Sequence, residues 1–211
     1  TIDAHNLRFS GKSIIHGKRT NASNIIKLHA KDLDCFNILV NEQSCHSTTY
    51  KDELHIVLPN SCGDEITIAI DYAAAITPAM HGIYPAYPSS GEVIIGTQFE
   101  SHHAREAFPC IDEPEAKATF DVTITAKAPV ILSNMPARLS TINNDGTSTV
   151  QFERTPRMSS YLVAFVTGDL QSVSTETQDG TAINVWSSKD HDIESLVFAL
   201  EVAVKTTEFF N

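Results

Sequence analysis

Gln98 and Glu100 are the side chains in this sequence whose types and spacing best suit binding of a charged ligand. Phe99 separates them in a strand-like segment, and residues two apart on a strand point to the same face. A carboxylate and an amide side by side can hold an ammonium group by an ion pair and a hydrogen bond. The alternative is that these two residues form only the polar face of an exposed strand.

Further charged residues follow this pair closely along the chain. A guanidinium beside two carboxylates favours a buried or half-buried network that ties an irregular loop to the core. We therefore predict a scaffolding role, and no catalytic role, for Arg105, Asp112, Glu113 and Lys117.

His102, His103 and Glu106 raise the question of a metal site. In a helix His102 and Glu106 would share a face, but Pro109 limits any helix here to little more than a turn. The spacing matches no known zinc motif, so we expect solvated or hydrogen-bonded side chains. The sequence also contains no His-Glu-x-x-His, Gly-x-Ser-x-Gly or glycine-rich phosphate motif. We predict that this chain contributes neither a metal ligand nor a catalytic residue.

Short strands are expected to position these residues. Apolar and polar side chains alternate in residues 26–31 and 65–72, as they do in half-buried strands. Residues 143–146 and 178–180 are typical of hairpin turns in which glycine supplies a positive φ. Closely spaced strands with turns between them predict an all-β fold, a large antiparallel β-sandwich or saddle-like domain.

Three less regular segments complete the β region. Residues 118–126 and 160–166 are predicted to be strands. Residues 77–91 contain three prolines and are predicted to form a long surface loop. This loop either approaches the candidate site or is a solvated connector.

The last part of the chain changes to a helical pattern. Apolar residues recur at helical spacing through residues 191–210, and Asp192 and Glu194 suit the positive end of a helix dipole. We predict that residues 1–188 form the β domain and that residues 189–211 form one α-helix, the first of a further domain. A helix that ends on two phenylalanines leads us to expect a fragment of a longer protein.

The composition narrows the classes of partner. The 26 acidic residues outnumber the 15 basic ones, and the formal net charge of −11 argues against nucleic acid or an anionic membrane as a partner. The sequence has no apolar run of about 18 residues that would predict a membrane span. Four scattered cysteines without a C-x-x-C pair favour reduced thiols and a cytoplasmic setting.

Several motifs occur in a characteristic order along nearly the whole chain. They are Met80-His81-Gly82-Ile83-Tyr84-Pro85, Gln98-Phe99-Glu100, Ala104-Arg105, and residues 108–114, 117–121, 133–136 and 155–162. Together they resemble the amino-terminal domain of zinc aminopeptidases of the aminopeptidase N family. The first motif is most similar to the bacterial and fungal branches.

This resemblance implies that Glu100 binds the α-amine of a peptide substrate and that Gln98 lines the pocket for the first side chain. It implies that the parent enzyme removes single residues from peptide amino termini, and that the C-terminal helix opens its catalytic domain. That domain would carry the zinc and the general base, so the chain alone is expected to be inactive. The expected partners are a peptide with a free amino terminus and the parent's own catalytic domain.

Two other functions stay open. A β-sandwich can be a stand-alone module that binds sugar or protein, because a fold does not determine a function. The unfinished helix argues against this, as does the single tryptophan, Trp186, which lies in a predicted strand. The second alternative is a homologue that has lost peptidase activity and serves as a scaffold.

Overall fold

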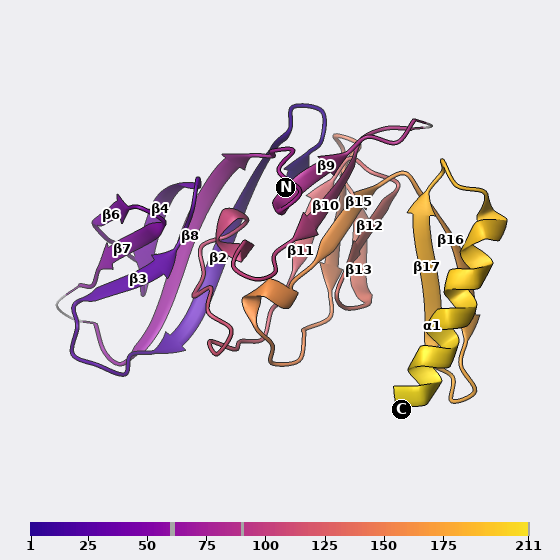
Figure 1. The fold of residues 1–211 in the computed structure, drawn as a ribbon. Coiled ribbons are helices and arrows are strands. Elements are labelled where there is room, and N and C mark those ends of the chain that lie inside the picture. The colour runs from indigo at the N-terminus through magenta and orange to yellow at the C-terminus, as the bar shows by residue number, and fades with distance from the viewer. Residues whose placement is uncertain (60–61, 90, 211) are drawn as a thin grey trace.

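Antiparallel strands make up most of the molecule, and one α-helix lies at its C-terminal end (Figure 1). The computed structural model describes residues 1–59, 62–89 and 91–210. The strands form packed sheets, so the predicted all-β class with a single C-terminal helix is confirmed.

The largest sheet has the strand order β13-β14-β11-β1-β2-β8-β4-β5. Its neighbours pair antiparallel except β1 and β11, which run parallel with Ile2 opposite Ala126. The strands are β1 (Ile2–Asp3), β2 (Arg8–Lys18), β4 (Asp34–Val40), β5 (Gln43–Ser44), β8 (Glu65–Ala75), β11 (Thr123–Ala126), β13 (Ala137–Ile142) and β14 (Ser148–Phe152).

A three-stranded sheet covers one end of the large sheet. It consists of β3 (Ile25–His29), β7 (Glu53–Val57) and β6 (Ser47–Tyr50), in that order. The alternating isoleucines Ile66, Ile68 and Ile70 of β8 are buried against Leu54 and Ile56 of β7 in a first core. Burying each such side chain contributes roughly 1.5–3 kcal/mol, so the period-two pattern stabilises this packing.

A four-stranded sheet carries the candidate site. Its order is β12 (Val130–Ser133), β15 (Phe165–Gly168), β10 (Ile94–Gln98) and β9 (Gly82–Ala86). Ile95 and Phe99 of this region belong to the second core, which Phe9 of β2 also enters. The prediction of a loop over residues 77–91 was wrong in its centre, because β9 is an edge strand. An edge position tolerates Pro85, which has no backbone N–H to donate.

Two further predicted strands are shorter than expected. Only Thr123–Ala126 of residues 118–126 forms a strand, and Ala118 makes an isolated bridge to Met158. Residues 160–166 begin as the 3-10 turn η2 (Ser160–Leu162) before β15 starts. The hydroxyl of Ser160 donates a hydrogen bond to Asp112, and this contact holds the segment in a turn.

The C-terminal part consists of a hairpin and a helix. The hairpin pairs β16 (Leu170–Glu176) with β17 (Ala182–Ser188), and the short turn η3 (Ile193–Ser195) leads into α1 (Leu196–Phe210), which packs on both strands. Apolar side chains remain exposed on α1: Val197, Phe198, Val202, Phe209 and Phe210. Among the described residues, no helix has the length and apolar character needed to cross a membrane.

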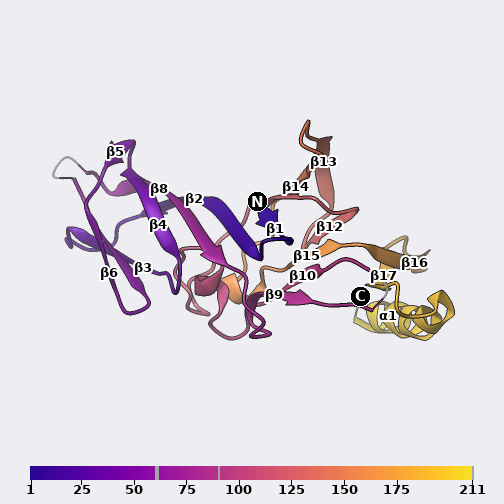
Figure 2. The same ribbon diagram turned by 90° about the horizontal axis from the view of Figure 1, so that it is seen from above.

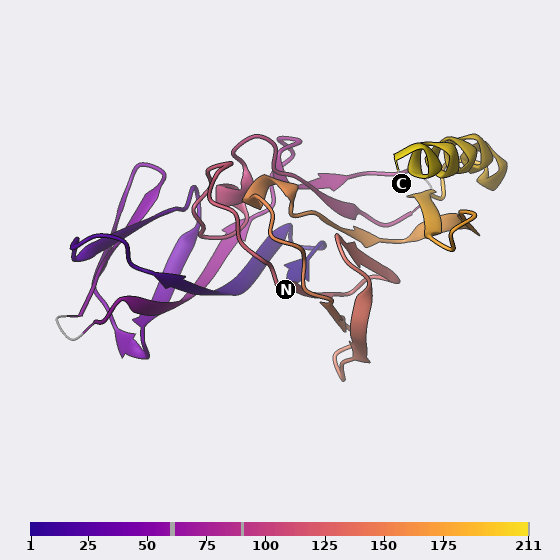
Figure 3. The same cartoon turned by 90° about the horizontal axis from the view of Figure 1, so that it is seen from below.

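The elements are arranged along one direction. The strands β3, β6 and β7 lie at one end, and β16, β17 and α1 lie at the other, in both Figure 1 and Figure 2. Seen from below, the N-terminus lies between these two ends (Figure 3). The four-stranded sheet that carries Gln98 therefore lies in the middle of the molecule.

Candidate functional site

Gln98 and Glu100 lie at the end of β10, on either side of a buried phenylalanine. Phe99 is only 1 % exposed, and its ring meets the ring of Phe108 edge to face at 6.0 Å. Gln98 and Glu100 are both exposed. Neither side chain forms a hydrogen bond or ion pair with any other described residue. The last residue of β10 and the turn that follows thus present an amide and a carboxylate to solvent, with no partner for either among the described residues.

A tight turn joins this pair to the 3-10 helix η1 (Ala104–Glu106). The backbone N–H of His103 donates to the carbonyl of Phe99 at 2.8 Å, which closes the turn. Ser101 and His102 form a local hydrogen bond of 2.8 Å between Oγ and Nδ1. The peptide bond between Glu100 and Ser101 is cis.

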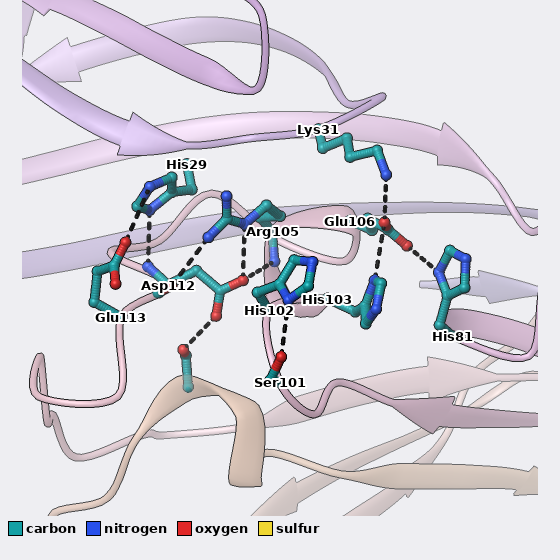
Figure 4. A network of polar contacts seen from close by, with 11 residues as sticks. His29, Lys31, His81, Ser101, His102, His103, Arg105, Glu106, Asp112 and Glu113 are labelled. Carbon is teal, nitrogen blue, oxygen red and sulfur yellow. Dashed lines mark hydrogen bonds and ion pairs between the residues drawn. The ribbon is translucent and has the colours of Figure 1, made fainter.

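Behind this turn lies the Glu106 cluster, which consists of Glu106, Lys31, His81 and His103 (Figure 4). The ammonium of Lys31 and Nδ1 of His103 approach Oε1 of Glu106 at 2.9 and 3.1 Å. Nδ1 of His81 lies 2.6 Å from Oε2. With the carboxylate ionised, both imidazoles must carry their proton on Nδ1 in order to donate.

The charge state of Glu106 follows from these contacts. Burial alone would raise the pKa of its carboxyl group, since only 13 % of the side chain is exposed. The hydrogen bonds from Lys31, His103 and His81 outweigh burial and lower that pKa to about 2. Glu106 is therefore an ionised carboxylate that accepts three hydrogen bonds.

Three residues of the Glu106 cluster, without Lys31, form the group in the described part of the chain that could hold a metal ion. One donor atom each of His81, His103 and Glu106 lies within 4.8 Å of the others. However, the two imidazole rings are stacked, with centroids 4.2 Å apart and planes 26° apart. A metal ion lies in the plane of each imidazole ring that binds it. The planes of the stacked His81 and His103 rings do not meet at a point close to a nitrogen of each ring, so one ion cannot be well placed for both. Since the Lys31 ammonium already neutralises the carboxylate, the arrangement suits hydrogen bonding and not metal coordination.

Asp112 is the centre of a separate, buried network. It is 2 % exposed, and its Oδ2 accepts hydrogen bonds from Nε of Arg105 at 3.0 Å and from the Arg105 backbone N–H at 3.2 Å. Its Oδ1 accepts the hydroxyl proton of Ser160 at 2.7 Å. Arg105 also donates from Nη2 to the Asp112 carbonyl at 3.0 Å. These contacts fasten the irregular loop to η1 and η2, because a buried polar group is costly unless it is hydrogen-bonded.

Glu113 and Lys117 lie near this network without joining the Arg105–Asp112 pair. Glu113 is more exposed, and its Oε1 is 3.6 Å from Nε2 of His29. The other ring nitrogen of His29 accepts the backbone N–H of Asp112 at 3.0 Å (Figure 4). The ammonium of Lys117 donates to the hydroxyl of Ser159 at 3.3 Å. The structure therefore brings together two of the four residues grouped from the sequence.

Three residues of these networks could not be recognised from the sequence. Lys31 is separated from Glu106 by 75 positions, His81 from Glu106 by 25, and His29 from Asp112 by 83. No local spacing links residues so far apart. His102, which would share a face with Glu106 only in a longer helix, stacks on His103 with ring centroids 4.7 Å apart and forms a hydrogen bond with Ser101.

Comparisons with known proteins place these features in context. Residues 1–162 match the family described as Peptidase M1 N-terminal domain. Aminopeptidase N of Lactococcus lactis subsp. lactis (strain IL1403) is 38 % identical over 215 residues, which cover 99 % of this chain and 25 % of that protein. The puromycin-sensitive aminopeptidase of Caenorhabditis elegans is 32 % identical over 218 residues, covering 96 % of this chain and 23 % of the relative. The chain thus spans about a quarter of the length of the curated relatives that it matches.

Proposed function

The chain belongs to the peptidase M1 N-terminal domain family, and from that premise we propose that it forms one wall of the substrate cleft of a zinc aminopeptidase. In this role Glu100 binds the α-amine of a peptide substrate, and Gln98 lines the pocket for the first side chain. The parent polypeptide removes single residues from peptide amino termini.

One observation carries this proposal: the exposed Gln98 and Glu100 have no partner elsewhere in the described part of the chain. A carboxylate that supports the fold is normally paired, as Asp112 is with Arg105. An unpaired carboxylate beside an amide is suited to an ammonium ligand, since a charge-assisted hydrogen bond is about twice as strong as a neutral one.

Recognition of the amine also explains how such an enzyme would select chain ends. Peptide bonds inside a chain have no ammonium group, so only a substrate with a free amino terminus would gain the ion pair with Glu100. The core beneath Phe99 keeps the backbone on both sides of the pair in place. This chain thus supplies selection and orientation, two parts of the work of an exopeptidase.

The zinc is proposed to lie on another part of the polypeptide. The sequence contains no His-Glu-x-x-His motif, and the stacked geometry of His81 and His103 does not suit a metal. Bound zinc would activate a water molecule for attack on the scissile carbonyl. The residues of this chain would hold the substrate amine at a fixed distance from that centre.

The C-terminal helix is proposed to join this chain to the catalytic domain. The apolar side chains exposed on α1 include Phe198, Phe209 and Phe210, and a protein surface of this kind is usually covered by a partner. The division into residues 1–188 and residues 189–211 stays a prediction. The packing of α1 on β16 and β17 supports a rigid connection across that boundary.

The test is Glu100→Gln in the complete polypeptide, assayed with an aminoacyl p-nitroanilide. Loss of a hydrogen-bonded charge costs about 1.5–3 kcal/mol, so we expect KM to rise roughly ten- to a hundredfold. Glu115→Gln is the matched control, because Glu115 is also exposed and its side chain has no partner among the described residues. Unchanged KM and kcat for Glu100→Gln would rule out the assignment.

A further inference from the structure

Glu106 contacts both of the segments that carry the candidate substrate-binding pair. Through His103 it holds the turn that contains Glu100, and through His81 it holds the start of β9, which pairs with β10. Lys31 adds a third connection, to the chain just after β3, and its backbone N–H donates to the Arg105 carbonyl at 2.9 Å.

The position of the Glu100 carboxylate depends on this turn. Its side chain has no partner in the described part of the chain, so only its backbone fixes it in place. The backbone hydrogen bond from His103 to Phe99 closes the turn. The contact between Nδ1 of His103 and Glu106 fixes the His103 ring. Releasing that ring would loosen the turn three residues from Glu100.

Gln98 is connected to the same carboxylate from the other side. Its partner across the sheet is Gly82, which has a positive φ of 64°. A Cβ at position 82 would lie 2.8 Å from Oε2 of Glu106 and 3.2 Å from its Cβ. Glycine therefore lets the Glu106 side chain lie directly against the strand pair at the level of Gln98.

We propose that Glu106 is a positioning residue that sets the distance and orientation of Gln98 and Glu100 relative to a bound peptide amino terminus. This inference rests on the proposed function of that pair. Glu106 does not itself contact the ligand, since its oxygens are occupied by Lys31, His81 and His103. It acts by joining three chain segments at one ionised carboxylate.

The chemistry of the contacts shows that an amide at position 106 would not reproduce this carboxylate. All three neighbours donate protons to Glu106, and a glutamine offers one acceptor oxygen and one donating NH₂ group. In Glu106→Gln the ion pair with the Lys31 ammonium is lost. The NH₂ group keeps a hydrogen bond to His81 or His103 only if that imidazole moves its proton from Nδ1 to Nε2. The size of the side chain stays nearly the same, so packing is preserved.

The experiment is a double-mutant cycle in the complete polypeptide between Glu106→Gln and Glu100→Gln, with KM and kcat for an aminoacyl p-nitroanilide. We expect Glu106→Gln alone to raise KM about five- to tenfold with kcat within about twofold. In the Glu100→Gln background the same substitution should change KM less than about twofold, because the charged one of the two groups that Glu106 positions is gone. Lys31→Met, which removes one donor, should show the same pattern with a smaller effect and serves as the second variant if Glu106→Gln folds poorly.

Glu53→Gln is the matched control for loss of a glutamate that binds lysine and histidine. Glu53 accepts from Lys27 at 3.3 Å and lies 2.7 Å from Nε2 of His55, on the sheet at the far end of the molecule. Its KM should equal that of the unmodified protein. An equal KM rise from Glu106→Gln in both backgrounds, or no rise in either, overturns the positioning role while leaving the proposed function intact. Failure of Glu100→Gln itself to raise KM overturns both.

Discussion

Two carboxylates only twelve positions apart have opposite surroundings in this molecule. Asp112 is buried and accepts hydrogen bonds from the Arg105 side chain, the Arg105 backbone and Ser160. Glu100 is exposed and has no partner within the described part of the chain. The first has used its acceptor capacity inside the fold, and the second leaves its acceptor oxygens to solvent.

Along one short segment, one carboxylate therefore supports the fold and the other stays available for the proposed function. A buried charge must be paired, and removing its partner is costly because a charge then remains in a low-dielectric interior. An exposed carboxylate is solvated by water and contributes little to stability unless a ligand replaces that water. The segment from Glu100 to Asp112 is thus anchored at one end and leaves a carboxylate open to solvent at the other, where we propose that a ligand binds.

The comparison is tested most directly by Asp112→Asn. The substitution keeps the shape but leaves Arg105 without its counter-ion, so we expect a loss of about 3–5 kcal/mol in the free energy of unfolding. Urea denaturation followed by circular dichroism measures it. Glu100→Gln should change the same quantity by less than about 0.5 kcal/mol. Equal losses of unfolding free energy for the two variants would show that the buried, paired Asp112 contributes no more to stability than the exposed Glu100.

A smaller effect is expected from Glu106, whose surroundings lie between these extremes. The pKa of its carboxyl group is lowered to about 2 from an ordinary value of 4.5. The ionised group therefore stabilises the fold fully above pH 4.5, and that stabilisation is lost as the pH falls through 2. After allowance for solvent screening we expect about 1–2 kcal/mol from this residue.

Urea denaturation at several pH values measures this contribution. Between pH 4.5 and 2 the unmodified chain should lose more stability than Glu106→Gln, by the amount just given. Parallel curves for the two proteins over that window would contradict the role of the three donors in holding the carboxylate ionised.

The strands of this fold could be predicted from the sequence where alternation is strong, as in Ile66, Ile68 and Ile70 of β8. The prediction was wrong for β9, where Pro85 and the neighbouring prolines concealed an edge strand. Local spacing also pointed to Arg105 and Asp112, since they are seven positions apart. Lys31 and His81 could not be found in this way, because only the packing of β3 and β9 around η1 brings them to Glu106.

A smaller effect than that of Glu106 is expected from Glu53, which separates the number of partners from burial as the cause of the contrast. Like Asp112 it has more than one partner, since Lys27 and His55 both contact Oε2, but like Glu100 it lies near solvent. The side-chain hydrogen bond from His55, followed by that from Lys27, lowers the pKa of its carboxyl group. Water screens such pairs. We therefore expect Glu53→Gln to shift the midpoint of urea denaturation less than Asp112→Asn and Glu106→Gln do. The shift should be smaller still at high salt concentration. If its shift matched that of Asp112→Asn, the number of partners and not burial would set the cost, and Glu100 would differ from Asp112 only in lacking neighbours.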